Sequence, residues 1–392
     1  MIDRAASLRR EGNFVGALTQ LRAALTLAPH RSDAHNGLGL LLRLIGEFDG
    51  ARRSFERAIA LDPGNAEAHA NLAASMLLDG DYEHGLDELT WTLRVPSVQH
   101  LYPLLGRRPL WAGEALRGRH LLVIAEQGFG DTISMLRYLP LLGTLDGTVT
   151  LAIQRPLFPL VPSVPAGCRL ADVRSAIEDA DCWIPILHLP WAFKTTVASI
   201  PAREGYLRAD VARVAEVRRR LRWGERDRRP RIGIAWGGNP LQINDRLRSI
   251  PFRELRPLRA VEGVRWISLQ RDERERECLA ADAPIAIEPT AHAIKDFGDL
   301  AALVASCDLV VTVDTAVAHL TGALGHPGIV LLSCCPDWRW ARSGDRAPWY
   351  ASLHPIRKTG VGPWEPVVEA AARSVTARLV RNHPPAAEEP PA

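Results

Sequence analysis

The sequence lacks several features that would assign it to a class at once. Its six cysteines form no CxxC pair and have no partner histidine at zinc spacing, so we expect buried free thiols rather than a metal site or a disulfide framework. No apolar run approaches the ~20 residues that a membrane-spanning helix needs. No apolar segment follows a basic start at the N-terminus, so we expect no secretory signal and a cytoplasmic protein.

Lysine is scarce, because only three of the 48 basic residues are lysine and the others are arginine. An arginine excess can indicate phosphate binding, since the guanidinium group pairs with two phosphate oxygens, but a genomic codon bias produces the same excess. The 45 acidic residues leave a net charge of +3, and no long basic tract is present. We therefore favour codon bias and expect no nucleic-acid partner.

Length and composition predict a folded protein of several parts. The 392 residues exceed the ~100–200 residues of a typical domain, so we expect two or three domains. Hydrophobic residues make up 47% of the chain and charged residues 24%, which is close to the average for globular proteins.

A period of 34 residues runs through the first hundred residues. The positions that recur carry small or apolar residues: Gly12, Phe14, Ala17, Leu21, Ala24 and Pro29 return as Gly46, Phe48, Ala51, Phe55, Ala58 and Pro63. The pattern resembles the tetratricopeptide repeat, whose paired helices bury a core only against their neighbours. We expect repeats over residues 1–94, with most of the first leading helix missing. They would serve as a platform for docking or for homo-oligomerisation.

Proline and glycine are dense over residues 95–118, where we place a linker. Residues 120–125 form a short apolar run, typical of a strand buried in a parallel sheet. A glycine-containing loop follows, and apolar residues then recur at helical spacing over residues 132–140. Ligands bind beyond the carboxyl ends of such strands. Four loop residues would lie there: Gln127, Gly128, Gly130 and Asp131.

This loop lacks the third glycine of a dinucleotide-binding fingerprint, so we expect no nicotinamide cofactor. Asp131 has two interpretations. Its side chain caps the following helix, a position that aspartate favours, or it presents a carboxylate to a hydroxyl group bound in the crevice. The local sequence leaves both roles open.

A second strand–loop–helix series follows residues 210–229, which we expect to be a solvated helix and loop between two domains. Residues 231–236 predict a buried strand, and Gly237 after it lets the backbone approach a ligand closely. Arg246 and Arg248 lie in the next loop. Two guanidinium groups beyond a strand end suit a diphosphate.

The most informative segment follows a β-branched strand over residues 307–313. Asp314 and Thr315 come at the strand end, where an aspartate can cap a helix, accept ribose hydroxyls, or do both. His319 lies one helical turn after Thr315 and on the same face. A lone histidine in a helix is usually structural, but this one lies beside the crevice, so both roles stay open.

Further apolar runs extend both series. They predict strands over residues 148–153, 182–185, 263–270 and 328–332. The strand over residues 263–270 ends in Gln270 at the edge of the crevice. Trp338 and Trp340 follow the last strand, where they either stack on a base or sugar or pack in the core.

Three segments together resemble the heptosyltransferase-related enzymes of glycosyltransferase family 9. They are residues 126–132, residues 236–251 with their Trp-Gly-Gly-Asn and Arg-Ser-Ile-Pro motifs, and residues 313–320 with Asp-Thr-Ala-Val-Ala-His. With repeats in front, the chain is similar to bacterial tetratricopeptide-repeat glycosyltransferases of this kin. The order of parts is also similar to that of the O-linked N-acetylglucosamine transferases, although their motifs are not visible.

The resemblance implies an α + α/β chain in which the repeats precede a GT-B fold, with two Rossmann-like domains facing each other across a cleft. It places the acceptor domain over residues 119–209 and the donor domain over residues 230–380. It implies no metal and no cofactor beyond the nucleotide-sugar. The proline- and alanine-rich residues 381–392 predict a disordered tail.

The same resemblance implies roles for single residues. Asp131 matches the acidic residue proposed as the base that deprotonates the acceptor hydroxyl. The donor-binding positions are Trp236, Gly237, Asn239, Arg246, Arg248, Gln270, Asp314, Thr315, Ala316 and His319. The acceptor or cleft positions are Gln127, Gly128, Gly130 and Trp338. The family commonly has a lysine after the tryptophan-containing strand, and Arg248 is the nearest basic match to it here.

The implied activity is an inverting, metal-independent transfer of a sugar from a nucleotide-sugar to a hydroxyl group of a glycan or a protein, with the repeats recruiting the acceptor or a partner. The alternative is a non-catalytic adaptor with a degenerate GT-B unit. An adaptor predicts no binding of nucleotide-sugars.

Overall fold

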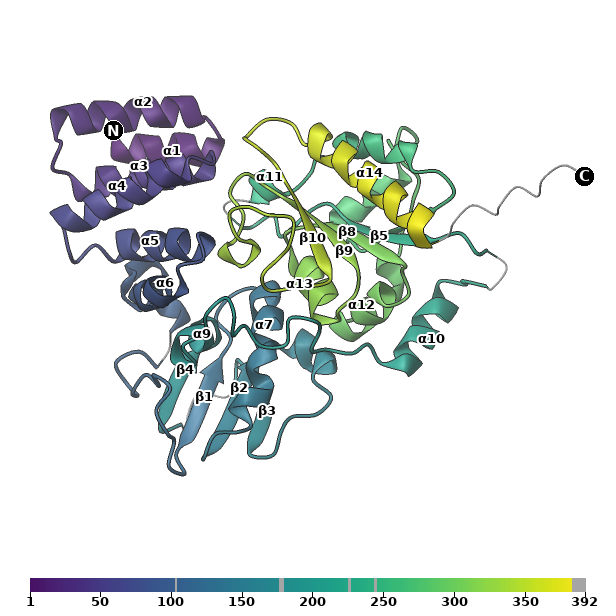
Figure 1. Ribbon diagram of the computed structural model, residues 1–392, viewed down its shortest axis with the longest axis horizontal. Helices are drawn as coiled ribbons and strands as arrows, with labels where there is room; N and C mark the ends of the chain where they lie inside the picture. The colour runs from purple at the N-terminus through teal and green to yellow at the C-terminus, as the bar shows by residue number, and fades with distance from the viewer. Residues whose placement is uncertain (103, 176–179, 225–226, 243–244, 383–392) are drawn as a thin grey trace, which may run out of the picture.

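The computed structural model describes residues 1–102, 104–175, 180–224, 227–242 and 245–382. The described part begins with stacked helices and continues into two parallel β-sheets (Figure 1). The predicted order of helical repeats followed by two α/β units is therefore confirmed. Asn244 and the predicted tail from residue 383 onward lie outside the described residues.

The repeats form three antiparallel helix pairs within the described residues. They are α1 (Ile2–Glu11), α2 (Phe14–Leu27), α3 (Ser32–Leu44), α4 (Phe48–Leu61), α5 (Ala66–Leu78) and α6 (Tyr82–Leu89). The 34-residue period reappears in the turns, because Gly12, Gly46 and Gly80 all have positive φ. A Cβ on Gly39 would lie 2.6 Å from the ring of Phe55, so the close helix approach needs a glycine.

The expectation that most of the first leading helix is missing is wrong. Helix α1 has 10 residues, against 13 in α3, and buries Ala5 and Leu8. The repeats then continue through two 3₁₀ helices, η1 (Thr90–Arg94) and η2 (Pro96–Leu101), into the first sheet.

The first sheet has the order β3-β2-β1-β4, and its strands are parallel. The strands are β1 (His120–Ile124), β2 (Thr148–Ile153), β3 (Cys168–Asp172) and β4 (Cys182–Pro185). The helix predicted over residues 132–140 is divided into α7 (Phe129–Met135), η3 (Leu136–Tyr138) and α8 (Leu139–Leu142). Pro140 explains the break, because it lacks an amide hydrogen and fits only the first turn of a new helix. Short helices η4 (Arg155–Leu160), η5 (Ile186–His188) and α9 (Leu189–Ala192) complete this unit.

The second sheet is also parallel, in the order β10-β9-β8-β5-β6-β7. Its strands are β5 (Arg231–Ala235), β6 (Arg265–Ser268), β7 (Ile287–Glu288), β8 (Leu309–Val313), β9 (Gly328–Leu332) and β10 (Leu353–Arg357). Its helices are α11 (Asp245–Arg248), η6 (Phe252–Ala260), η7 (Glu273–Leu279), η8 (Ala291–Ala293), α12 (Phe297–Val304), α13 (Ala316–Ala323), η9 (Trp338–Trp340) and α14 (Glu365–Asn382). The loops after β5 and β8 lie side by side, because these strands are neighbours.

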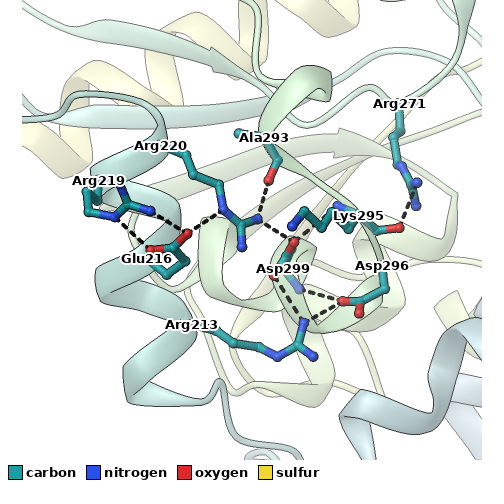
Figure 2. A network of polar contacts seen from close by, with 9 residues as sticks. All are labelled: Arg213, Glu216, Arg219, Arg220, Arg271, Ala293, Lys295, Asp296 and Asp299. Atoms are coloured by element: carbon teal, nitrogen blue, oxygen red, sulfur yellow. Dashed lines mark hydrogen bonds and ion pairs between the residues drawn. The ribbon is translucent and has the colours of Figure 1, made fainter.

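The connection between the sheets contains α10 (Val211–Arg220), which is not a free solvated helix. Figure 2 shows Arg213 and Arg220 of α10 reaching acidic residues at the start of α12, while Arg219 pairs with Glu216 of α10 itself. Arg213 Nη1 lies 2.7 Å from Asp296 Oδ1, and Arg220 Nη1 lies 2.7 Å from Asp299 Oδ2. Burial opposes ionisation of Asp299, but the hydrogen bond from Arg220 holds the pKa of this carboxyl below its usual value. The network fixes α10 to the second sheet.

The repeats and the first sheet share a continuous core. Leu77, Tyr82 and Leu86 of the repeats belong to the same buried apolar cluster as β1 and β2. The backbone amide of Arg342, after η9, also donates to Leu78 O at 3.0 Å. The repeats are therefore docked on both α/β units rather than held by a linker alone.

The cysteines are all free, and three of them are buried: Cys182, Cys307 and Cys334. Among the described helices, none combines the length and apolar character required to cross a membrane. The described residues also contain no group of three or more His, Cys, Asp or Glu side chains placed to hold a metal ion.

Candidate active site between the two sheets

A cavity of about 1090 Å³ lies where the carboxyl ends of both sheets face each other. Its walls come from the loops after β1, β5, β8 and β9 and from helices α3 and α5 of the repeats. Crevices at the carboxyl ends of parallel strands are the usual ligand sites of such folds. Its volume is at the upper end of the ~300–1,000 Å³ typical of ligand pockets, so it has room for more than a single small ligand.

Most residues predicted for the site line this cavity. These are Gln127, Gly128, Gly130, Asp131, Gly237, Asn239, Arg248, Gln270, Asp314, Thr315, Ala316, His319 and Trp338. Of the predicted positions, all of which the structure describes, Trp236 and Arg246 do not line it. The structure thus brings the motifs of both α/β units to one place.

Trp236 and Arg246 point elsewhere for separate reasons. Trp236 is 1% exposed in the core, where it packs on Phe252 and its Nε1 donates to Glu277 Oε2 at 3.0 Å. Arg246 is exposed, and its guanidinium group occupies the space where a Cβ on Gly12 of the repeats would lie. Of the two arginines predicted to face a diphosphate, only Arg248 lines the described cavity.

Asp131 lies in the first turn of α7 and faces the cavity. Its Oδ2 accepts from the Gly128 amide at 3.1 Å, so its carboxylate stabilises the helix start, although the N-cap residue itself is Gly128. Its Oδ1 accepts from Arg339 Nη2 at 3.0 Å. Burial raises the pKa of Asp131, and the positive charge of Arg339 opposes the increase. Asp131 thus stabilises the helix start from its first turn rather than as the N-cap, and the same carboxyl faces the cavity; its role toward a bound hydroxyl group stays a prediction.

A second carboxyl group, Glu126, lies directly before the loop at the end of β1. Its Oε2 accepts from the Ile186 amide at 3.1 Å. Burial raises its pKa to about 8, and the nearby charge of Asp131 adds to the increase. Glu126 is therefore mostly protonated at neutral pH, and Asp131 is the carboxyl group that faces the cavity and pairs with Arg339.

On the opposite wall, Thr315 is the N-cap of α13, and its hydroxyl oxygen accepts from the Val317 amide at 3.3 Å. The Asp314 carboxyl beside it is largely buried, and burial, followed by the charge of Asp337, raises its pKa to about 6. Gly130 of α7 packs against this wall, since a Cβ there would lie 2.7 Å from His319 Cδ2. The two α/β units meet closely at this point.

Gln270 holds a loop rather than standing free in the cavity. Its Oε1 accepts from the Gly237 amide at 3.1 Å, and its Nε2 donates to the Gly237 carbonyl at 3.1 Å. Asp245 similarly binds Arg248 Nε at 3.3 Å and Arg274 Nη2 at 2.7 Å. These contacts fix the shape of the loop after β5 and the position of Arg248.

The sequence interpretation missed several lining residues. They include Gln154, Arg271, Asp272, Asp296, Asp337 and Arg339 from the two α/β units, and Arg43, Leu44, Ala74 and Leu78 from the repeats. For Arg339 the sequence contained one indication of a place in the site, because this residue lies between Trp338 and Trp340 in the loop after β9. The repeat residues had none, since their place depends on how the repeats dock.

Comparisons with known proteins agree with this architecture. Models of the tetratricopeptide repeat match residues 2–66 and 54–83, and the model of glycosyltransferase family 9 (heptosyltransferase) matches residues 267–357. Protein FlbA of Caulobacter vibrioides is 29% identical over 289 residues, which are 68% of this chain and 48% of FlbA. The chain thus spans about half the length of this curated relative.

Solved structures of low identity are also similar. The E. coli ADP-heptose lps heptosyltransferase II is 13% identical with a TM-score of 0.47, covering 67% of this chain and 99% of that one. A family 9 glycosyltransferase of Veillonella parvula is 13% identical with a TM-score of 0.48, covering 68% and 99%. A mutant O-GlcNAc transferase of Thermobaculum terrenum is 16% identical with a TM-score of 0.30, covering 97% and 91%. The family matches therefore indicate tetratricopeptide repeats at residues 2–83 and a segment similar to glycosyltransferase family 9 (heptosyltransferase) at residues 267–357, which contains Asp314, Thr315 and His319.

Proposed function

We propose that the protein transfers a sugar from a nucleotide-sugar donor to an acceptor hydroxyl group, with inversion at the anomeric carbon and without a metal ion. The observation that carries this proposal is the placement of Asp131 in the same cavity as Asp314, Thr315 and His319. A base from one sheet thereby faces the donor motif of the other.

The transfer needs a carboxylate that takes the acceptor proton. In the proposed reaction, Asp131 accepts that proton while the acceptor oxygen bonds to the anomeric carbon. The bond from that carbon to the diphosphate breaks on the opposite face, and the electron pair leaves with the nucleoside diphosphate. Arg248 is the cavity group suited to stabilise the departing charge, because the amides of Gly237 and Gly238 already donate to Gln270 and Ser249.

Asp314 and Thr315 are proposed to hold the donor. The family name, heptosyltransferase, makes a nucleotide-activated heptose the first donor to test. Two lining residues support a donor of this class, because Asp314 can accept hydrogen bonds from hydroxyl groups and Arg248 can pair with a diphosphate.

The repeats are proposed to contact the acceptor directly. Arg43 and Leu44 of α3 and Ala74 and Leu78 of α5 belong to the cavity wall. An acceptor that reaches Asp131 therefore passes a surface that combines a cation with apolar side chains. Both a glycan and a protein segment fit this description, and acceptor assays with each separate them.

The test is calorimetric titration with ADP-, GDP- and UDP-sugars, followed by a transfer assay with the donor that binds. We expect one nucleotide class to bind both the wild type and Asp131→Asn, and only the wild type to transfer sugar. If no nucleotide-sugar binds, the adaptor function is favoured. If Asp131→Asn transfers at the wild-type rate, Asp131 is not the base.

A further inference from the structure

Arg339 connects the two α/β units at the proposed base. It lies in η9 of the second unit, and its side chain is only 2% exposed. Its Nη2 donates to Asp131 at 3.0 Å, and its Nη1 donates to Asp337 at 2.9 Å. A planar guanidinium group can hold two carboxylates at fixed angles in this way, whereas a lysine ammonium group cannot.

Aromatic rings hold Arg339 in this position. Its Cζ lies 4.9 Å from the ring centroid of Trp338 and 6.0 Å from that of Trp349. The two tryptophans pack edge to face, with centroids 5.1 Å apart at 88°. A cation between carboxylates and aromatic faces is well stabilised in a buried site.

The rings themselves are anchored by the repeats. Tyr82, the first residue of α6, is 4% exposed, and its hydroxyl oxygen accepts from Trp349 Nε1 at 2.7 Å. Its ring packs edge to face on Trp338, with centroids 5.7 Å apart. A continuous series of contacts therefore runs from α6 to the carboxylate of Asp131.

We infer that Arg339 is a positioning residue for Asp131, and that the repeats hold it in place through Tyr82, Trp338 and Trp349. The inference rests on the proposed function, in which Asp131 is the base. It assigns the repeats a second role besides contact with the acceptor, because their docking also determines the geometry and charge of the catalytic carboxylate.

Several charged groups face Asp131. Arg339 favours its ionised form, and Asp337 of the same loop opposes it. Glu126 at the end of β1, with its pKa raised to about 8, is mostly uncharged at neutral pH. His319 of α13 is neutral, because burial lowers its pKa well below 6.5. Burial and the nearby charge of Asp337 raise the pKa of Asp314 to about 6. Among these groups, Arg339 is the cation, so its removal raises the pKa of Asp131.

The test measures the pH profile of kcat/KM in Arg339→Met, Arg339→Lys and Tyr82→Phe. We expect the acid limb of the profile to move upward by ~1–3 pH units in Arg339→Met, the usual effect of losing a close opposite charge. In Arg339→Lys the positive charge is kept, so the acid limb should return close to its wild-type position, while kcat stays below that of the wild type. Tyr82→Phe gives a smaller upward shift, and Tyr102→Phe, at a buried tyrosine whose ring packs on Trp183 and His188, gives none.

An infrared titration of the Asp131 carboxyl, assigned by subtracting Asp131→Asn, gives a second readout that does not need activity. If Asp131→Asn retains transfer, Asp131 is not the base, and if no nucleotide-sugar binds, the proposed function fails; in both cases this titration still reports the effect of Arg339 on the Asp131 carboxyl. An unmoved Asp131 titration in both Arg339 variants overturns the inference. A shift in Arg339→Lys or Arg339→Met with none in Tyr82→Phe overturns the part assigned to the repeats. Thermal melting confirms that each variant is folded.

Discussion

The imidazole Nε2 of His319 lies 3.7 Å from Asp314 Oδ1, yet the two side chains do not form a charged pair. Burial lowers the pKa of His319 well below 6.5, so the ring is neutral at physiological pH. Its Nδ1 is engaged with the Tyr350 hydroxyl at 2.8 Å. The Asp314 carboxyl is therefore not paired with a charged imidazole, and the nearby charges of Arg248 and Arg339 favour its ionised form. In the proposed function this carboxylate accepts hydrogen bonds from donor hydroxyl groups.

The first prediction concerns the pH dependence of donor binding. Asp314 has its pKa raised to about 6, so it is ionised above that pH and protonated below it. A carboxylate that accepts sugar or ribose hydroxyls loses acceptor capacity on protonation. We expect the donor KM of the wild type to rise as the pH falls through 6, and that of Asp314→Asn to be higher and nearly independent of pH, as measured in steady-state assays.

Asp314→Asn should also make the protein more stable at pH 7. A carboxyl whose folded-state pKa exceeds its unfolded value stabilises the fold while protonated, and this contribution is lost as the pH rises from about 4 to about 6. Replacing this carboxyl by an amide should raise the free energy of unfolding at pH 7 by up to about 3 kcal/mol, as measured by denaturant unfolding. A variant that is less stable than the wild type at pH 7 would contradict this account.

The second prediction concerns Gly130, where the two α/β units meet. A Cβ there would lie 2.7 Å from His319 Cδ2 and 3.3 Å from Ala316 Cα, and neither the buried ring nor the backbone can give way freely. We expect Gly130→Ala to separate α7 from α13 and to lower kcat by roughly tenfold or more, as small misplacements of reacting groups do. Gly360→Ala, which meets no atom within 4 Å, is the matched control in the same assay.

The fold was largely predictable because most strands, the edge strand β4 among them, consist mainly of apolar residues. Strands β2, β4 and β9 begin and end at the predicted residues. The strands that were missed include β3 and β10, which form edges of their sheets. β3 contains Arg169 and ends in Asp172, and β10 contains Pro355, so neither has the continuous apolar run of a strand buried on both faces.

The site was predictable only where it follows strand ends. Loops after parallel strands must meet at one edge of a sheet, so Asp131 and Asp314 could be placed at a crevice from local sequence. The orientation of Trp236 and Arg246 depends on packing around them, which local sequence does not contain. The cavity wall from α3 and α5 depends on contacts between parts far apart in the chain.

The third prediction concerns Gln270, which binds both the amide and the carbonyl of Gly237. Gln270→Ala removes both hydrogen bonds and leaves the buried peptide group of Gly237 without these partners, so the loop after β5 should lose its fixed shape. We expect a donor KM ~10-fold higher or more, equivalent to about 1.4 kcal/mol, with a smaller change in acceptor KM. Gln99→Ala, at an exposed position in η2, should leave both constants unchanged.

The fourth prediction concerns the part of the cavity wall that the repeats supply. Ala74 of α5 lines the cavity opposite the loops of the two sheets, so Ala74→Trp should fill space that the acceptor occupies. We expect an acceptor KM raised by ~10-fold or more, while calorimetry shows the same donor affinity as the wild type. Ala60→Trp, at an exposed position of α4, adds the same ring outside the cavity and should change neither constant. Equal acceptor KM values in Ala74→Trp and the wild type would show that the acceptor reaches Asp131 without touching the repeats. Ala74→Trp tests direct contact between the repeats and the acceptor, whereas Tyr82→Phe tests the positioning of Arg339 by α6, so the two variants separate these roles.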